Sequence, residues 1–380
     1  MIYLDNNSTT PIRPEVFEAM KPYLTERFFN PSASYQEGAE ITKEIESARE
    51  FFAKSINAES PEEIYFVSCG SEANTWAIQR LDVSDLTVIT DNIEHHSVLN
   101  ALNQDAHITY ADRQEGIFSI EGLLQAIEIE RAPYVNRTPP KNILISCMWV
   151  NNEIGTIQPI KVIGDISNKY NTFFHVDAVQ AYGKIPIDVQ DNHIDMLSVS
   201  SHKIGAPRGC GFLYVRKGTP LKPLIYGGQQ ENYMRAGTEN VAGIIGFKTA
   251  AEIAIENMDN NMSKLWELHD HMLDSLNNIS GIRIINRDME HIPSTISVDC
   301  GVPAEQMLAY LDQFSILVSS GSACNSKDDK PSHVLTALNM SDKRAGQVIR
   351  FSLSPDITFD QLDYVTEILE KGIELLGGGA

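Results

Sequence analysis

"TFFHVDAVQAYGKIPIDVQDNHIDMLSVSS", residues 172–201, decides the fold class because it holds two short apolar runs on either side of a more polar stretch. The runs, 172–179 and 194–201, are rich in β-branched and aromatic residues, as strands buried on both faces usually are. Similar runs occur upstream, at residues 62–68, 86–92 and 141–150. The sequence therefore predicts a sheet whose strands form a buried layer.

Segments with helical periodicity separate these apolar runs. They lie at residues 72–81, 95–103, 119–129 and 160–170. Strands that alternate with helices are typical of a mainly parallel sheet with helices on both faces, joined by right-handed crossovers. The predicted fold class is α/β.

In the last third of the chain, the predicted strands and helices no longer alternate regularly. A long helical stretch, 239–279, is followed by short apolar runs and a closing helical stretch, 358–376. We expect a large α/β domain at residues 15–240 and a smaller α+β domain made of residues 1–14 and 241–380. No linker rich in proline and glycine separates them, so we expect the two domains to pack tightly.

Composition and charge narrow the class of protein. Of the 380 residues, 42% are hydrophobic and 21% charged, which fits a soluble globular protein. The net charge of −21 argues against binding to nucleic acid or to an acidic membrane, since both require a basic surface. We find no apolar run of the ~20 residues that a membrane span needs, and no signal-peptide pattern. We expect a cytoplasmic protein.

The cysteines are few and scattered: Cys69, Cys147, Cys210, Cys300 and Cys324. Their number is odd and no two form a Cys-x-x-Cys motif, so the sequence predicts neither a disulfide framework nor a zinc site. We expect no metal. Most cysteines of cytosolic proteins are small buried hydrophobic residues, and we expect at most one or two of these thiols to react.

Candidate functional residues follow the predicted strands, where large α/β sheets bind their ligands. Gly70 and Ser71 begin a helix, whose free N–H groups suit a phosphate, although an ordinary helix cap explains them equally well. His95 also begins a helix, as a cap or as a catalytic group. Asn152 follows another strand, where a turn is the plain explanation. No dinucleotide-binding or P-loop motif occurs.

Asp177 and Lys203 make a sharper pair. Asp177 follows an apolar strand, where a carboxylate needs a cationic or N–H partner. Lys203 follows the next strand, and a lysine at the ligand edge of a sheet readily acquires a low pKa and forms a Schiff base. A phosphate site, a carboxylate and such a lysine together suggest pyridoxal phosphate, with the carboxylate holding the pyridinium nitrogen protonated.

Longer motifs carry a resemblance to a known family. They include "YLDNNSTTPIRPEV" (3–16), "FVSCGSEAN" (66–74), "HVDAVQAYGKIPIDV" (175–189), "SSHKIGAPRGCGFLYVRKG" (200–218), "SSGSACNS" (319–326) and "IRFSLSP" (349–355). The chain resembles the cysteine desulfurases of the NifS/IscS group, in the class-V aminotransferase family. The resemblance implies the fold-type I architecture of enzymes that use pyridoxal 5'-phosphate: a large mainly parallel sheet and a smaller α+β domain.

The resemblance also implies roles around the cofactor ring. Lys203 matches the lysine that forms the Schiff base, and Asp177 matches the partner of the pyridinium nitrogen. Gln180 matches the residue bonded to the phenolic oxygen. His95 would stack on the ring and move protons, and Asn152 would lie beside cofactor and substrate.

The resemblance also indicates which residues bind the cofactor phosphate. By resemblance, Gly70, Ser71, Ser200 and His202 hold the phosphate. Thr238 matches a residue that reaches the phosphate of the other subunit. The resemblance therefore implies a homodimer whose active sites are shared between subunits.

Two further residues define the reaction that the resemblance implies. Arg350 matches the anchor of the substrate carboxylate, a role that suits its bidentate fork. Cys324 matches the catalytic cysteine on a mobile loop. L-cysteine would give L-alanine and a persulfide on Cys324, and the sulfur would go to iron–sulfur cluster assembly, another thio-cofactor or tRNA thiolation. The sequence does not identify the acceptor protein.

A second enzyme function stays open. Another lyase or aminotransferase that uses pyridoxal phosphate, such as a selenocysteine lyase, would need Lys203, Asp177 and His95 but not Cys324. Departures from the group's pattern at Phe29, Tyr35 and Thr75 leave the substrate preference open.

Overall fold

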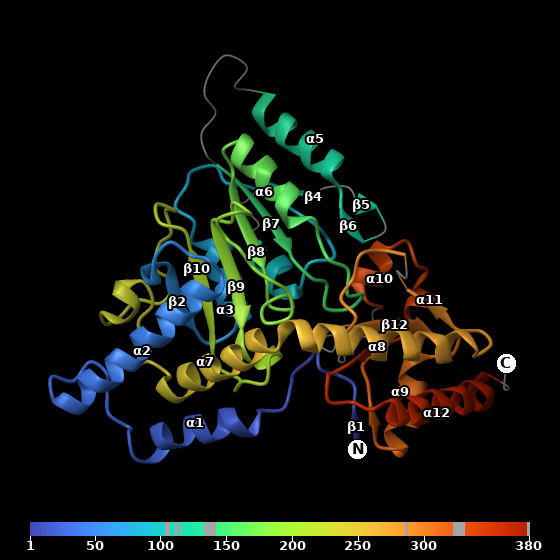
Figure 1. Cartoon of the computed structure of the whole chain (residues 1–380). Coiled ribbons are helices and arrows are strands. Elements are labelled where there is room, and N and C mark those ends of the chain that lie inside the picture. The colour runs from blue at the N-terminus through green and yellow to red at the C-terminus, as the bar shows by residue number, and fades with distance from the viewer. Residues whose placement is uncertain are drawn as a thin grey trace.

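The chain forms a large sheet covered by helices and a smaller α+β part beside it (Figure 1). The structure is a computed structural model. It describes residues 1–102, 107–110, 113–114, 116–132, 142–285, 288–321 and 331–377.

The large sheet has seven strands in the order β2-β10-β9-β8-β7-β3-β4. In that order their bounds are Ile64–Val67, Gly211–Val215, Met196–Ser200, Phe173–Asp177, Ile143–Met148, Thr87–Thr90 and His107–Tyr110. β10 runs antiparallel to both of its neighbours, and the other pairs are parallel. The predicted fold class, a mainly parallel sheet within an α/β protein, is confirmed.

Strands at the centre of this sheet are buried on both faces, as the apolar runs predict. Every residue of β8, β9 and β10 is buried. Successive side chains of a strand point to opposite faces. In β10, Phe212 and Tyr214 pack in one apolar cluster, whereas Leu213 and Val215 pack in another on the opposite face.

The helices divide between these two faces. The cluster around Phe212 takes buried residues from α1, α2, α5, α6 and α7, which span Pro14–Thr25, Gln36–Ser55, Ile120–Arg131, Ile160–Lys169 and Val241–Glu256. The cluster around Leu213 takes buried residues from α3 (Gly70–Gln79) and α4 (His96–Leu99). The sheet is therefore covered on both sides.

A three-stranded antiparallel sheet forms the smaller part, in the order β11 (Arg283–Ile284), β12 (Thr295–Asp299), β14 (Val348–Ser352). Its core includes residues of α8, α9 and α12, which span Met258–Asn277, Ala304–Gln313 and Phe359–Gly377. The N-terminal strand β1 (Ile2–Tyr3) pairs with β13 (Ile316–Leu317), so both ends of the chain lie in this part (Figure 1). Short elements complete the fold: β5 (Arg113–Gln114), β6 (Ile117–Phe118), α10 (His333–Ala337) and α11 (Asp342–Ala345).

The helical stretch predicted at 239–279 is two helices rather than one. α7 ends at Glu256 and α8 begins at Met258, with Asn257 between them at φ −103° and ψ 9°. Phe247 of α7 packs in the core of the large sheet, whereas Leu268 of α8 packs in the core of the smaller part. The division at residues 240 and 241 stays a prediction, and α7 packs with the large-sheet core.

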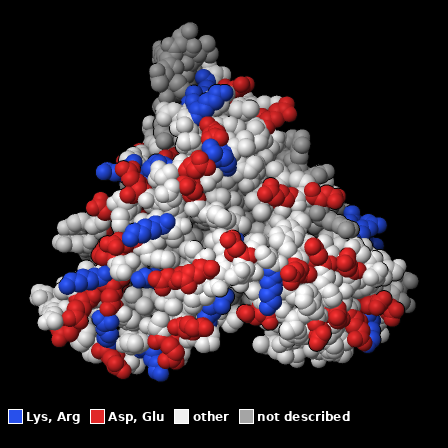
Figure 2. Space-filling model, in the orientation of Figure 1, with Lys and Arg blue, Asp and Glu red and all other residues white. Residues whose placement is uncertain are grey.

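The charged side chains on the surface agree with the acidic composition of the chain. On the face in Figure 2, Lys and Arg side chains are interspersed with more numerous Asp and Glu side chains. Within the described ranges, no helix combines the length and the apolar character that crossing a lipid bilayer requires.

Candidate active site

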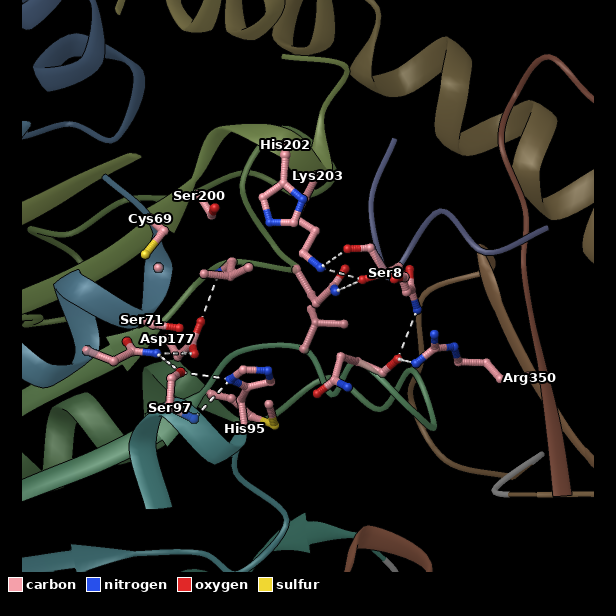
Figure 3. A pocket seen from close by; sticks show the side chains of 18 residues that line it. Ser8, Cys69, Ser71, His95, Ser97, Asp177, Ser200, His202, Lys203 and Arg350 are labelled. Carbon is pink, nitrogen blue, oxygen red and sulfur yellow. Dashed lines mark hydrogen bonds between the residues drawn. The ribbon is translucent and has the colours of Figure 1, made fainter. Parts of the chain in front are cut away.

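A cavity of about 250 Å³ opens at the carboxyl ends of the central strands (Figure 3). Ten of the predicted site residues line it: Gly70, Ser71, His95, Asn152, Asp177, Gln180, Ser200, His202, Lys203 and Arg350. Residues from both ends of the sequence thus meet in one place, which we call the first cavity.

Lys203 follows β9 in a short 3-10 turn, Ser201–Lys203. Its Nζ donates hydrogen bonds to the carbonyl oxygens of Asn7 and Ser8, at 2.6 and 2.7 Å (Figure 3). The N-terminal segment therefore closes one side of the first cavity and holds the lysine head. This segment lies in the motif "YLDNNSTTPIRPEV", but the sequence alone assigns it no role at the site.

Asp177 ends β8 and is only 5% exposed. Its Oδ2 accepts a hydrogen bond from Asn74 Nδ2 at 2.7 Å, and its Oδ1 accepts one from the Val179 N–H at 3.0 Å. These donors satisfy the buried carboxylate and fix its direction. Asn74 lies one turn into α3, beyond the helix start that the sequence had singled out.

A short chain of hydrogen bonds joins this carboxylate to His95. Asn74 Nδ2 also donates to Ser97 Oγ at 2.8 Å, and Ser97 Oγ lies 2.7 Å from His95 Nδ1. The Ser97 N–H donates to His95 Nδ1 at 3.1 Å, so in the neutral ring the proton is on Nε2. Burial lowers the pKa of His95, and the charge of Lys203 lowers it further against the opposing charge of Asp177. The ring is therefore neutral at pH 7.

The start of α3 is shaped to take an anion. Cys69 caps the helix without a side-chain hydrogen bond, so the first N–H groups of α3 lack a side-chain cap. A Cβ on Gly70 would lie 2.8 Å from Val179 Cγ2, so only glycine leaves the space open. Ser200 Oγ is buried in the cavity wall, and no residue in the described part of the chain forms a hydrogen bond with it. These features favour anion binding over an ordinary helix cap.

His202 belongs to the same wall. Burial, followed by the charge of Lys203, lowers the pKa of His202 to about 4, so its ring is neutral at pH 7. Its Nδ1 lies 3.1 Å from Thr9 Oγ1. A neutral imidazole can donate one hydrogen bond to a phosphate without adding a second cation beside Lys203.

Arg350 lies on β14 and is 2% exposed. Its Nη2 donates to Asp5 Oδ1 at 2.8 Å, and its Nη1 donates to the carbonyl oxygens of Asn152 and Gly321 at 2.9 and 3.1 Å. The guanidinium Nε is buried and has no partner among the described residues. Asp5, which the sequence did not single out, therefore holds the residue expected to bind the substrate carboxylate.

Gln180 and Asn152 are both tied to Asn7. Gln180 Nε2 donates to the Asn7 carbonyl at 2.9 Å, and Gln180 Oε1 accepts from Lys184 Nζ at 2.9 Å. Asn7 Nδ2 in turn donates to the Asn152 carbonyl at 3.1 Å. The two contacts of Gln180 fix which end of its amide faces which neighbour.

Two predicted residues are not part of the first cavity as described. Thr238 is exposed in the segment before α7 and does not line the cavity. Cys324 lies outside the described residues. The departures Phe29 and Tyr35 contact each other edge to face, with ring centroids 6.0 Å apart, and neither lines the cavity.

The other cysteines fall into two groups. Cys147, Cys210 and Cys300 are buried, and burial raises the pKa of each thiol, to about 12 for Cys210 and Cys300. Such thiols are poor nucleophiles. Cys69, by contrast, lines the first cavity. Across the described parts of the chain, no group of three or more His, Cys, Asp or Glu side chains is placed to hold a metal ion.

Comparison with known proteins identifies the family. The model of the class-V aminotransferases matches residues 2–365. The chain belongs to the class-V aminotransferase family. It is 43% identical over 387 aligned residues to the cysteine desulfurase IscS of Dictyoglomus turgidum, covering 99% of this chain and 95% of that protein.

Two solved structures are similar to this member of the class-V aminotransferases. A NifS-like protein superposes with a TM-score of 0.89 at 33% identity, covering 99% of this chain and 100% of that chain. The protein SspA in complex with cysteine superposes with a TM-score of 0.79 at 33% identity, covering 93% of this chain and 99% of that chain. The predicted resemblance to the NifS/IscS group is confirmed.

Class-V aminotransferases such as the cysteine desulfurases use pyridoxal 5'-phosphate, and the first cavity has the groups to hold it. Asp177 presents a buried carboxylate, and Lys203 a primary amine. The open space at Gly70 and the unpartnered hydroxyl of Ser200 suit a phosphate. The residues of this chain therefore fit the cofactor of the family.

Proposed function

We propose that this chain is a cysteine desulfurase, which removes sulfur from L-cysteine, releases L-alanine and holds the sulfur as a persulfide on Cys324. The observation that carries the proposal is that Lys203, Asp177, His95 and Arg350 line one cavity in a chain 43% identical to a cysteine desulfurase. The likeness to a structure solved with cysteine supports the choice of substrate.

The cofactor supplies an electron-poor ring that stabilises negative charge at the α-carbon of a bound amino acid. Lys203 would hold it covalently, and Asp177, fixed by Asn74, would pair with its ring nitrogen. Gly70, Ser71, Ser200 and His202 would hold its phosphate. Gln180 Nε2 would donate to its phenolic oxygen.

The chain's own residues bind the substrate and move its proton. Arg350 binds the carboxylate of L-cysteine with its Nε–H and the second hydrogen of Nη2, the two donors that no described residue engages. Lys203 Nζ takes the proton from the α-carbon, because the amine is the strongest base in the cavity once it is released from the cofactor. His95, neutral through burial, moves a second proton without placing a cation against the ring.

Cys324 receives the sulfur and passes it on. Its thiolate attacks the sulfur atom of the substrate, and the bond between that sulfur and the β-carbon breaks. The three-carbon remainder gains a proton at the β-carbon and leaves as L-alanine. We propose that the sulfur supplies iron–sulfur cluster assembly or the thiolation of another cofactor or of tRNA, in the cytoplasm. The acceptor protein is left open.

We also propose a homodimer in which Thr238 of one subunit reaches the phosphate of the other. Large apolar side chains are exposed on α1, just after it, and in the segment before Thr238: Phe17, Leu24, Phe28, Tyr226 and Tyr233 are 50–72% exposed. Exposed apolar groups of this kind favour an interface. Of these, Tyr226 and Tyr233 lie close to Thr238 in the sequence, which supports a shared site.

The decisive experiment concerns Cys324. The purified holoprotein with L-cysteine and a reductant should yield alanine and sulfide in equal amounts. Cys324→Ala should keep the bound cofactor, as judged by its visible absorption, and lose both products. Alanine formation that persists in this variant would instead favour the lyase or aminotransferase function that does not use Cys324.

Mixed dimers test the shared site. Thr238→Asp places a carboxylate against the partner's phosphate, where the like charges repel, and Lys203→Ala disables its own chain. Differently tagged copies of the two variants, purified together, should recover up to about half of the normal activity, because one site of each mixed dimer keeps both residues. Mixed dimers as inactive as their parents would contradict the shared site.

A further inference from the structure

A second cavity lies at the junction between the N-terminal segment, α8 and the loop after β14. Its volume is about 150 Å³. We call it the junction cavity, and Arg13, Lys184, Ser294 and Leu353 are among the residues that line it. It shares Asn7 and Lys203 with the first cavity, so these two residues form a common wall.

Arg13 brings an unpaired cation to this cavity. Its N–H donates to the Gly205 carbonyl at 3.0 Å, and its side chain lies over Gly205, where a Cβ would come within 2.8 Å of Arg13 Cγ. Gly205 has φ +86°, a conformation that favours glycine. Because glycine has no side chain, the Arg13 side chain can lie directly against the backbone at this position. Within the described ranges, the guanidinium makes no hydrogen bond or ion pair.

Two more polar groups in the lining lack an anionic partner. Ser294 is 4% exposed, and its buried Oγ has no hydrogen-bond partner within the described ranges. Lys184 Nζ donates to the neutral amide oxygen of Gln180 at 2.9 Å. A buried hydroxyl without a partner costs free energy, which a ligand oxygen would recover. Among the described residues of the lining, the only carboxylate is that of Asp356, which is exposed.

The rest of the lining is mostly apolar, with Ile204, Met258, Met262, Leu265 and Leu353 among it. A cavity of this volume is the size that holds benzene in an engineered protein, so it accepts roughly six non-hydrogen atoms. Small size, a cationic end and an apolar wall together describe the ligand. It is an aliphatic acid with a short chain.

We propose that the junction cavity binds a small aliphatic monocarboxylate, with the carboxylate on Arg13 and a hydrogen bond from Ser294. The hydrocarbon part packs against Met262 and Leu353. This site differs from the substrate site, whose guanidinium, Arg350, belongs to the first cavity and is already paired with Asp5. The inference does not depend on which reaction the first cavity catalyses.

Isothermal titration of the holoprotein with butyrate tests the site, because butyrate has six non-hydrogen atoms. Wild-type protein should bind one equivalent in the millimolar range. Arg13→Gln should weaken binding by about tenfold, since it removes a charged hydrogen bond, and Ser294→Ala should weaken it by roughly threefold. n-Butylamine, of similar size but opposite charge, should not bind.

Matched variants separate the two cavities. Arg350→Lys should change butyrate binding by less than about threefold, and so should Lys161→Gln, which removes a cation from an exposed pair on α6. Loss of binding with Arg350→Lys but not with Arg13→Gln would place butyrate in the first cavity and overturn the proposal. No binding by the wild type would also overturn it. If Arg13→Gln fails to fold, as judged by circular dichroism, Ser294→Ala and Arg13→Lys decide the matter.

Discussion

The two cavities share a wall of Asn7 and Lys203 but differ in how their polar groups are partnered. In the first cavity, Asp177 accepts two hydrogen bonds and Arg350 is paired with a carboxylate. In the junction cavity, Arg13 has no partner among the described residues. The difference indicates that the first cavity is preorganised for chemistry, whereas the second needs an external anion to complete it.

Placing charged groups in the buried first cavity costs free energy, and ion pairs between residues far apart in the sequence offset part of that cost. Breaking a buried ion pair by removing one partner destabilises a protein by about 3–5 kcal/mol, because the other charge stays buried. Arg350, at 2% exposed, and Asp5, whose side chain is 19% exposed, form a largely buried pair of this kind, at 2.8 Å. We infer that this ion pair helps to hold the N-terminal segment against the first cavity.

The largest expected effect is at the shared wall. Lys203→Ala should lower alanine formation by about 10³-fold or more, since it removes both the covalent hold on the cofactor and the base. Borohydride should fix the cofactor to a peptide that contains Lys203 in the wild type. Lys161→Ala, on the exposed face of α6, is the control and should keep full activity. A labelled peptide that contains another lysine would remove Lys203 from this role.

The next effect concerns the fixed carboxylate of the first cavity. Asp177→Asn should lower kcat by about 10²-fold or more, as the loss of one preorganised electrostatic contact does. Asn74→Ala should lower it by roughly tenfold, because it frees the carboxylate to rotate but leaves its charge. The double variant should be no worse than Asp177→Asn alone. Additive losses would show that Asn74 does not act through Asp177.

How far the sequence predicts this arrangement depends on the distance along the chain. Asp177 and Lys203 follow neighbouring strands, so their meeting could be predicted from the strand pattern alone. The partners that orient the site could not. Asn74 lies 103 positions from Asp177, and Asp5 lies 345 positions from Arg350, and nothing local in either segment marks the contact. Tertiary packing alone brings them together.

The helix break at Asn257 is likewise a feature of the fold that the sequence alone does not predict. Neither glycine nor proline lies near it, and apolar residues continue with helical spacing on both sides. What ends α7 is the change of core, from the large sheet at Ala254 to the smaller part at Leu265. A pattern of apolar residues does not say which core each residue joins.

A moderate effect on stability is expected beneath the first cavity. His175 on β8 is fully buried, with Nδ1 2.9 Å from Ser146 Oγ and Nε2 2.9 Å from Ser198 Oγ, and burial lowers its pKa from 6.5 to about 3. Between these pH values the unfolded chain binds the proton and the folded chain does not. The free energy of unfolding should therefore fall as the pH falls, by up to about 1.4 kcal/mol per unit for this group.

Chemical denaturation of wild-type protein and His175→Asn between pH 7 and pH 4.5 measures this contribution. The variant should be less stable at pH 7. Its free energy of unfolding should fall less steeply as the pH falls, by the slope that the uptake of about one proton contributes. His271→Asn, which changes a partly exposed histidine paired with Asp363, is the control and should keep the wild-type slope. Parallel slopes for wild type and His175→Asn would mean that His175 does not carry the acid sensitivity.

The smallest effect links the two cavities through Lys184, which lines the junction cavity and bonds Gln180 of the first. Burial, then the charges of Lys203 and Arg350, lower the pKa of Lys184 to about 7. Arg13, Lys203 and Asp356 are the other charged groups among the described residues of this lining. Because the ammonium loses its proton as the pH rises from 6 to 8 while butyrate stays ionised, butyrate binding should weaken by roughly threefold over that range. Lys184→Met should bind butyrate with an affinity that no longer changes over this range. If the pH dependence survives in Lys184→Met, another group carries it, and the two cavities are neighbours that share a wall without sharing a charge.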